Sequence, residues 1–305
     1  MNEIKKVLIC GIGAIGSILA HKISKFDNEN LKILVDKNRL NSYTKSPKIF
    51  NGEELNLNYI TPENTDFKAD LIIIATKFNA LNDVVKNIEN FVDENTIIMS
   101  ILNGISSEEI LAQKYNWKNI PLAFFLGHSE TIATNNYFYD NRGTVIFGTK
   151  ENFTNPNIIP TIEKYFTQAK INYQIPEDIN YAYWLKFMLN ISTNQPSAIL
   201  RLTFGEMTSN PEFMNLFNNI MKEVQTIAKA EGVKNTEKMI EDALTALKNL
   251  MPEGKTSMLQ DVEAKRQTEV EMLAGTMITL GKKHNIPTPY NTVMYELIKS
   301  IQNNY

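Results

Sequence analysis

Three glycines near the amino terminus have the spacing of a dinucleotide-binding loop. The first glycine permits a tight turn, the second lets a pyrophosphate approach the backbone, and the third allows close helix–strand packing. The phosphates would lie at the positive end of the helix that follows. The alternative is a glycine-rich turn in an α/β fold that binds no dinucleotide. The loop consists of Gly11, Ile12, Gly13, Ala14, Ile15 and Gly16.

An acidic residue stands where such a fold binds the adenosine ribose. Asp36 lies 25 residues after Gly11, at the end of the second apolar run. A carboxylate here accepts hydrogen bonds from the ribose hydroxyls of NAD, and its charge repels the 2′-phosphate of NADP. Lys37 and Arg39 follow, and each is suited either to pair with a 2′-phosphate or to form a solvated turn. These residues therefore leave the choice between NAD and NADP open.

Polar residues at regular spacing form a stripe within an apolar segment of the second half of the chain. Lys186, Asn190 and Asn194 are four residues apart, which places them on one face of a helix. Burial of such a stripe without partners is costly. The stripe therefore faces either solvent or a polar cleft.

Four further polar residues are candidates for a site. Lys77 and Asn103 each follow a run expected to be a strand, at the carboxyl end where open α/β sheets bind ligands. Exposed loop residues are the alternative. Ser257 looks like a helix start, and Glu269 falls within the helical spacing of Asp261–His284, where an ordinary surface carboxylate is the alternative. The histidines and the single cysteine have no metal-ligand spacing, so we predict no metal.

The first half of the chain alternates between apolar runs and helical spacing. Continuous β-branched runs suit strands buried on both faces of a parallel sheet. The alternation predicts an α/β fold with a doubly wound parallel sheet of the Rossmann type. Thr144–Gly148 is expected to be a later, antiparallel edge strand. The predicted strands are Val7–Cys10, Leu31–Val35, Leu71–Ala75, Ile97–Ile101 and Leu122–Leu126.

From about residue 178 the strand-like runs disappear. Pro211 suits the first turn of a helix, and Gly232 and Asn285 stand where helices commonly end. We therefore predict a Rossmann dinucleotide-binding domain over residues 1–176 and an all-helical substrate and catalytic domain over residues 177–305. The expected helices are Ile179–Asn194, Pro211–Glu231, Thr236–Leu250, Asp261–His284 and Asn291–Gln302.

Length and composition agree with two domains and exclude several classes of protein. The chain has 305 residues, with 43% hydrophobic and 21% charged, which excludes wholesale disorder. A net charge of −3 gives no basic character that would favour nucleic acid or an anionic membrane. No apolar run approaches the ~20 residues that span a bilayer. A single cysteine suits a reducing compartment, so we predict a cytoplasmic protein without nucleic-acid or membrane partners.

The ordered set of motifs resembles the ketopantoate reductase family (2-dehydropantoate 2-reductases). No single motif is specific, but the set is, and it covers nearly the whole chain. The motifs are Gly11-x-Gly13-x-x-Gly16, Thr76-Lys77, Asn103-Gly104, Trp184-x-Lys186-x-x-x-Asn190-x-x-x-Asn194, Ser257-Met258-Leu259-Gln260-Asp261, Thr268-Glu269, Gly275 and Ile286-Pro287-Thr288-Pro289.

The resemblance implies NADPH-dependent reduction of 2-dehydropantoate (ketopantoate) to (R)-pantoate, on the route to pantothenate and coenzyme A. It places the active site in the cleft between a Rossmann domain and a helical domain. Lys186 would be the general acid, since a positioned ammonium can stabilise and protonate an oxygen that gains negative charge. Glu269 would belong to the catalytic site. Substrate would contact Asn190, Asn194 and Ser257, while Lys77 and Asn103 would contact the cofactor or help organise the site. From the residues themselves, we expect the glycine loop, Asp36 and Lys37 to contact the cofactor.

Two positions depart from the family pattern. Gln195 and Pro196 follow Asn194, where the family often has Asn-Pro, so the local substrate pocket differs. Asp36 stands where the family usually has arginine, so NADH stays beside NADPH as a candidate cofactor. The alternative functions are a related NAD(P)-dependent 2-oxo or 2-hydroxy acid dehydrogenase and a non-catalytic dinucleotide-binding regulator. The expected partner is a small-molecule 2-oxo acid, with a homodimer left open.

Overall fold

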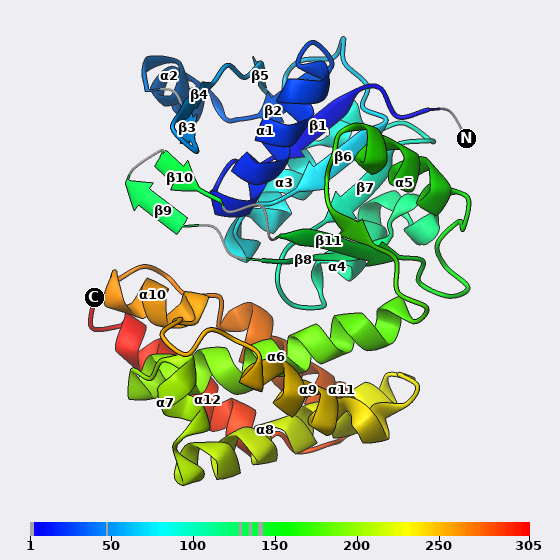
Figure 1. Ribbon diagram of the computed structural model, residues 1–305. Helices are drawn as coiled ribbons and strands as arrows, with labels where there is room; N and C mark the ends of the chain where they lie inside the picture. Colours follow the sequence, from blue (N-terminus) through cyan, green and yellow to red (C-terminus); the bar gives the residue numbers. More distant parts are fainter. Residues whose placement is uncertain (1–2, 47, 128–129, 134–135, 140–142) are drawn as a thin grey trace. The chain divides into compact units, whose positions relative to one another are not determined.

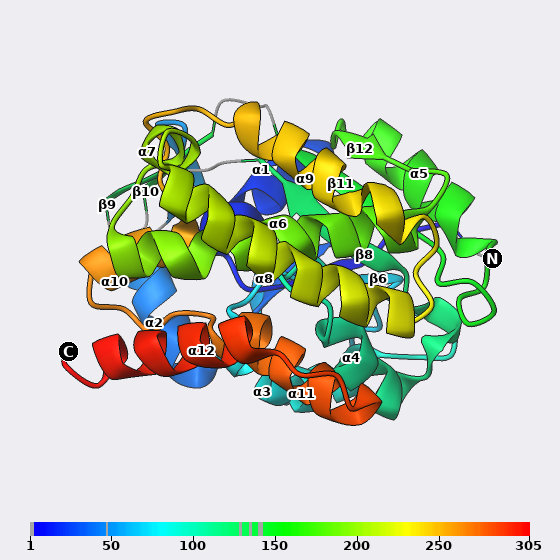
Figure 2. The same cartoon turned by 90° about the horizontal axis from the view of Figure 1, so that it is seen from below.

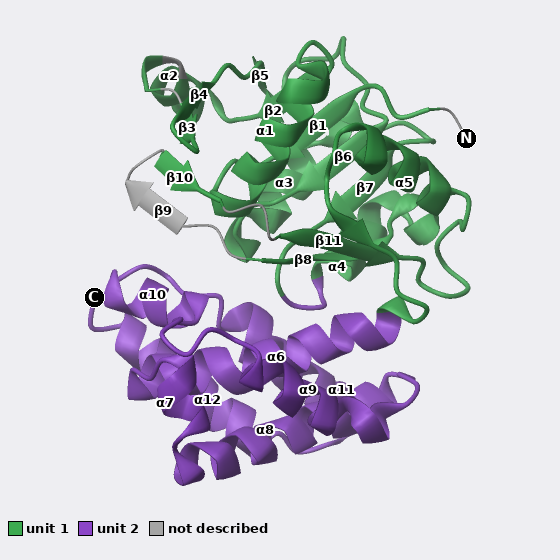
Figure 3. Ribbon diagram, in the orientation of Figure 1, with its two compact units in different colours: residues 1–103, 107–179 green, residues 104–106, 180–305 purple. Residues whose placement is uncertain are grey.

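The computed structural model describes residues 3–46, 48–127, 130–133, 136–139 and 143–305. Contacts between Cα atoms divide the chain into two compact units (Figure 3). Unit 1 comprises residues 1–103 and 107–179, and unit 2 comprises residues 104–106 and 180–305. The division into functional domains at residue 176 stays a prediction.

Unit 1 combines strands and helices, which alternate along part of the chain (Figure 1). Its strands are β1 (Val7–Cys10), β2 (Leu31–Leu34), β3 (Lys48–Phe50), β4 (Glu53–Leu55), β5 (Tyr59–Ile60), β6 (Leu71–Ile74), β7 (Ile97–Ser100), β8 (Leu122–Leu126), β9 (Glu130–Ala133), β10 (Asn136–Phe138), β11 (Thr144–Gly148) and β12 (Tyr173–Gln174). Its helices are α1 (Ala14–Asp27), α2 (Lys37–Lys45), η1 (Phe78–Ala80), α3 (Leu81–Asn87), η2 (Glu89–Phe91), α4 (Ser107–Tyr115), η3 (Trp117–Asn119) and α5 (Ile158–Gln168).

A parallel sheet with the order β5-β2-β1-β6-β7 forms the centre of unit 1. Three of its strands, β1, β6 and β7, are buried along their whole length. Cys10 pairs with Leu34 on one side and with Ile74 on the other, so β1, β2 and β6 end at the same level. The predicted Rossmann sheet is thus confirmed, and the segments after these three strands lie along one edge of the sheet.

The strand predicted over Leu122–Leu126 belongs to a second sheet. β8 pairs antiparallel with β11, and β11 pairs parallel with β12. The antiparallel pairing predicted for Thr144–Gly148 is confirmed, but its edge position is wrong because β11 lies between two strands. Strands buried on both faces have the same apolar pattern in either kind of sheet, so the pattern cannot assign them. A third sheet, β4-β3-β10-β9, was not predicted.

The regular elements among the described residues of unit 2 are all helices, as predicted. The amphipathic helix α8 lies between α9 on one side and the pair α11 and α12 on the other (Figure 2). Asn210 accepts a hydrogen bond from Phe213 N at 3.0 Å, and Pro211 occupies the first turn. The helices are α6 (Ile179–Leu200), α7 (Phe204–Thr208), α8 (Pro211–Ala230), η4 (Thr236–Lys238), α9 (Met239–Lys248), α10 (Ser257–Glu263), η5 (Glu271–Gly275), α11 (Thr276–His284) and α12 (Pro289–Gln302).

The single helix predicted over Asp261–His284 is wrong, because α10 ends at Glu263. Arg266 N donates to Asp261 O at 2.8 Å, and Lys265 N donates to Val262 O at 3.1 Å. With Lys265 at φ +50°, this is a Schellman motif, which stops a helix. A loop and the π-helical turn η5 follow before α11 begins.

Among the described residues, no helix is long and apolar enough to cross a membrane.

Candidate active site

The three glycines of the loop between β1 and α1 have different surroundings. Gly11 has φ +94°, and a Cβ there would lie 2.8 Å from Ala75 O at the end of β6. A Cβ at Gly16 would lie 1.9 Å from Gly11 O, so the first turn of α1 packs directly on the loop. A Cβ at Gly13 would meet nothing within 4 Å. The fold thus requires the first and third glycines, whereas the second faces open space.

The start of α1 leaves its backbone donors available. Ile12 is buried, Ala14 and Ile15 are half-buried, and no side chain caps the helix at Gly13. The first turn of α1 contains no acidic residue. The first N–H groups of a helix have no intrahelical acceptor and favour an anion. Beside the loop, Thr76 Oγ1 is buried without a hydrogen-bond partner among the described residues. These features fit the pyrophosphate of a dinucleotide.

Charged residues after β2 are paired with one another. Asp36 caps α2 by accepting a hydrogen bond from Arg39 N at 2.8 Å, and its carboxylate lies 3.3 Å from Arg39 Nε. Lys37 Nζ lies 3.0 Å from Glu63 Oε1. Hydrogen bonds from Thr61 and Lys37 lower the pKa of Glu63 to about 2. Both cations that suited a 2′-phosphate in the sequence are therefore next to carboxylates.

Lys77 and Asn103 follow the carboxyl ends of β6 and β7. Lys77 is exposed, and its carbonyl accepts a hydrogen bond from Ala80 N at 3.0 Å as η1 begins. Asn103 is half-buried and precedes Gly104, which has φ +86°. A Cβ at Gly104 would lie 2.5 Å from Met272 Cγ, so the turn needs glycine there.

Lys186 lies in α6 within an apolar environment. Its side chain is half-buried, and burial lowers the pKa of Lys186 to about 8. Among the described residues, none forms a hydrogen bond or an ion pair with its ammonium. An ammonium of this kind holds its proton at neutral pH and can release it to a nearby base.

The two asparagines of the stripe are buried in α6, and one of them holds a neighbouring segment. Asn194 Nδ2 donates to Asn190 O at 3.0 Å. Asn194 Oδ1 accepts from Ser257 Oγ at 3.1 Å and from Met258 N at 3.2 Å. Ser257 itself is exposed. Hydrogen bonds therefore link Asn190, Asn194 and Ser257. Lys186 lies in the same helix as the two asparagines.

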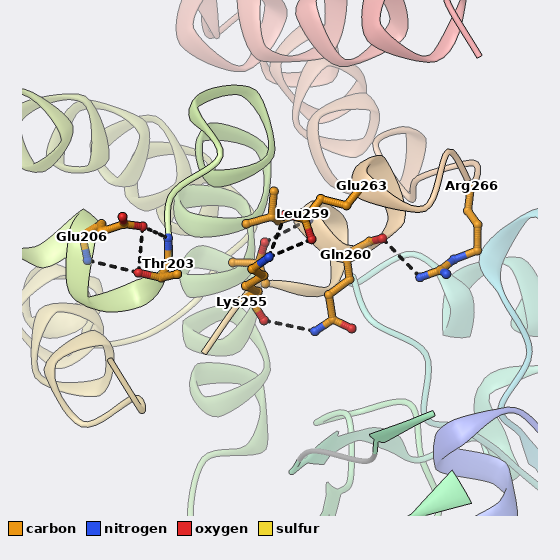
Figure 4. Close-up of polar contacts among 8 residues, drawn as sticks. Thr203, Glu206, Lys255, Leu259, Gln260, Glu263 and Arg266 are labelled. Atoms are coloured by element: carbon orange, nitrogen blue, oxygen red, sulfur yellow. Dashed lines mark hydrogen bonds and ion pairs between the residues drawn. The ribbon is translucent and has the colours of Figure 1, made fainter. Parts of the chain in front are cut away.

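Several contacts fix the start of α10 (Figure 4). The helix begins at Ser257, and Thr256 caps it by accepting a hydrogen bond from Leu259 N at 3.2 Å. Lys255 Nζ lies 2.7 Å from Glu263 Oε1, and Gln260 Nε2 donates to Lys255 O at 3.3 Å. Figure 4 also shows Arg266 donating to Gln260 O and the capping box that begins α7. These contacts therefore hold in place the first turn of α10, which carries Ser257.

Glu269 and Glu271 differ in their surroundings. Glu269 is half-buried and lies in the loop before η5, not inside a helix. Glu271 binds α12, because its carboxylate accepts from Tyr295 Oη at 2.8 Å and from Lys299 Nζ at 2.9 Å. Glu271 thus secures helix packing, and the catalytic role expected of Glu269 stays a prediction.

Sequence reasoning missed the polar supports of α6. Ser197 Oγ lies 2.6 Å from Thr256 Oγ1, and Gln195 Oε1 accepts from Ala274 N at 3.1 Å. Ser197, Thr256 and Gln195 are all buried. The available signal was the run Ser-Thr-Asn-Gln-Pro-Ser within an apolar helix, whose buried polar groups require partners.

Comparison with known proteins matches both parts of the chain to one family. A model described as Ketopantoate reductase PanE/ApbA matches residues 7–152, and one described as Ketopantoate reductase PanE/ApbA C terminal matches residues 178–302. The chain is 28% identical over 304 residues to the 2-dehydropantoate 2-reductase of Aquifex aeolicus (strain VF5), covering 97% of each. It is 24% identical over 296 residues to that of Streptococcus pyogenes serotype M1, covering 96% of each.

Solved structures of low identity share the fold. D-mandelate dehydrogenase with NADH and anilino(oxo)acetate has a TM-score of 0.87 at 21% identity, covering 98% of this chain and 99% of that one. The 2-dehydropantoate 2-reductase from Geobacter metallireducens GS-15 has a TM-score of 0.80 at 21% identity, covering 97% and 99%. The dimeric ketopantoate reductase from Staphylococcus aureus has a TM-score of 0.78 at 21% identity, covering 98% and 99%.

Proposed function

The chain is an oxidoreductase that belongs to the ketopantoate reductase family, and we propose that it reduces 2-dehydropantoate to (R)-pantoate with Lys186 as the proton donor. The observation that carries this proposal is the placement of Lys186 in α6, on one face with Asn190 and Asn194, where burial lowers the pKa of the lysine to about 8. It shares its helix with Asn190 and Asn194, and Asn194 binds Ser257.

Lys186 acts as the acid in this proposal. Reduction of a ketone builds negative charge on its oxygen, and an ammonium stabilises that charge and then transfers a proton to it. A lysine with an ordinary pKa would give up its proton much less readily. The lowered pKa therefore supports the assignment. Glu269, on the loop before η5, is the second residue that we assign to the catalytic site.

The polar side chains next to the lysine would bind substrate. The substrate carries a carboxylate, which hydroxyl and amide N–H groups recognise. Asn190 and Ser257 supply such groups. Asn194 has its oxygen occupied by Ser257 and Met258, so we assign it chiefly to holding Ser257 in place.

The glycine loop would hold the cofactor pyrophosphate at the start of α1, with Lys77 and Asn103 after the neighbouring strands. The bound dinucleotide would supply the hydride. The resemblance favours NADPH, and the open face of Gly13 suits NADPH and NADH equally.

A second candidate is an NADH-linked reductase of another 2-oxo acid. Two ion pairs after β2 favour this candidate, Asp36 with Arg39 and Lys37 with Glu63. In both pairs, the cation that could bind a 2′-phosphate already has a carboxylate partner. Such exposed pairs are weak, so a 2′-phosphate can displace them. The D-mandelate dehydrogenase that shares this fold was solved with NADH, which supports this candidate.

One set of kinetic measurements tests the proposal. NADPH and NADH are each assayed with ketopantoate and with a panel of other 2-oxo acids, and kcat/KM is compared. We expect the highest value with ketopantoate. A higher value with another 2-oxo acid would favour the second candidate, and dinucleotide binding without any turnover would favour a regulatory protein.

We also propose a cytoplasmic homodimer whose partner in the reaction is a small molecule. The dimeric Staphylococcus aureus neighbour supports the assembly. Analytical ultracentrifugation at micromolar concentration tests it, and a monomer throughout would contradict it.

A further inference from the structure

The turn that follows Glu269 is wider than an α-helix. Gly275 N donates to Val270 O, five residues earlier, at 3.1 Å. Glu269 O accepts hydrogen bonds from Met272 N at 3.1 Å and from Leu273 N at 3.2 Å. Single π-turns of this kind are rare and frequently occur at functional sites. The backbone of Glu269 is therefore held by η5 itself.

One backbone donor of this turn relies on a side chain from α6. In an α-helix, Ala274 N would donate to Val270 O, four residues earlier. Instead, Ala274 N donates to Gln195 Oε1 at 3.1 Å. Both residues are fully buried, so water cannot replace the acceptor. Loss of Gln195 would leave a buried N–H unsatisfied, which favours rearrangement of the turn.

The amide of Gln195 is fixed at both ends. Its Nε2 donates to Ile191 O at 3.3 Å, one turn earlier in α6, while its oxygen faces η5. Its neighbour Asn194 binds Ser257 at the start of α10. Successive residues of a helix point about 100° apart, so the two side chains reach different segments. Asn194 and Gln195 thus connect α6 to both loops that carry the other proposed site residues of unit 2.

We propose that Gln195 is a positioning residue for the reaction. By holding η5, it sets the backbone of Glu269 relative to α6, which carries Lys186. The role rests on the proposed function, because it matters to turnover only if Glu269 and Lys186 act there.

The test removes the acceptor and keeps the size of the side chain. Gln195→Met should lower kcat by about 10-fold to 100-fold, as small misplacements of catalytic groups do, while KM for ketopantoate stays within threefold. Amide hydrogen exchange over residues 270–276 should become faster. Gln195→Glu restores an oxygen acceptor of the same reach. It should recover most of kcat at pH 6, where a buried carboxyl group is protonated.

Gln225→Met is the matched control. Gln225 Nε2 donates to Thr236 O at 2.7 Å and joins α8 to η4 in the same unit. Loss of this hydrogen bond should lower the Tm and leave kcat unchanged. Should Gln195→Met fail to fold, Gln195→Asn is assayed by the same criteria, because its amide is one methylene too short to reach Ala274.

A kcat for Gln195→Met within threefold of the parent, with faster exchange over residues 270–276, would reduce Gln195 to a structural role and overturn the proposal. An equal loss in Gln225→Met, or no recovery in Gln195→Glu, would also overturn it. Lys186→Ala and Glu269→Ala separate the two levels of the argument. If neither lowers kcat, the proposed function fails, whereas if both do and Gln195→Met does not, only this inference fails.

Discussion

Raising the pH through 8 should switch off proton donation by Lys186. With a pKa of about 8, about 90% of the lysine is protonated at pH 7 and about 9% at pH 9. Because kcat/KM reports the free enzyme, it should fall about tenfold between these pH values. A lysine with the ordinary pKa of 10.5 would remain about 97% protonated at pH 9 and give almost no decline. The assay is the initial rate of ketopantoate reduction at low substrate, from pH 6 to pH 10.

Lys186→Arg is the control for this profile. Guanidinium stays protonated throughout this range, so whatever activity the variant retains should not vary between pH 7 and pH 9. The same decline in Lys186→Arg would show that another group titrates. A parent value at pH 9 within twofold of the value at pH 7 would refute the reasoning that burial has prepared this lysine to act as an acid.

Three further substitutions test the remaining assignments. Gly13→Val should abolish dinucleotide binding in a calorimetric titration and leave the Tm near the parent's, because a Cβ at this position meets nothing within 4 Å. Gly16→Val should instead lower the Tm, because its Cβ would lie 1.9 Å from a carbonyl oxygen. Asp36→Arg should raise the NADPH/NADH ratio of kcat/KM by roughly tenfold, since it replaces repulsion with a phosphate partner. An unchanged ratio would show that Asp36 does not face the ribose. Glu269→Ala should lower kcat, and its effect should not add fully to that of Lys186→Ala if the two share one site; full additivity would separate them.

The sheet of unit 1 was predictable because its strands are short, continuous apolar runs. β1, β2, β6 and β7 begin where predicted, and the glycine loop follows the first of them. The strands of the third sheet are three or four residues long, and in β4 two of three residues are exposed. β3 and β4 form a hairpin across Asn51-Gly52, a local signal that our reading of the sequence missed. The pairing of β10 with β3 joins segments far apart in the chain, so local sequence carries little signal for it.

In unit 2, several features could not be predicted from local sequence patterns. The end of α10 depends on Lys265 in a left-handed conformation, and no glycine or asparagine marks it. The helix α6 continues through Pro196, although proline usually ends or kinks a helix. Gln195 and Ser197 provide tertiary contacts on either side of that proline. Gln195 and Ala274 are 79 residues apart, so a pattern within one helix could not reveal their contact.

The most direct test of the central claim is single-turnover hydride transfer in Lys186→Ala with saturating cofactor and ketopantoate. General acid catalysis is typically worth about 10²–10⁴-fold, or about 3–5 kcal/mol of barrier. The variant should therefore transfer hydride slower by that order while it binds the dinucleotide as tightly as the parent. A rate within threefold of the parent would remove Lys186 from the mechanism.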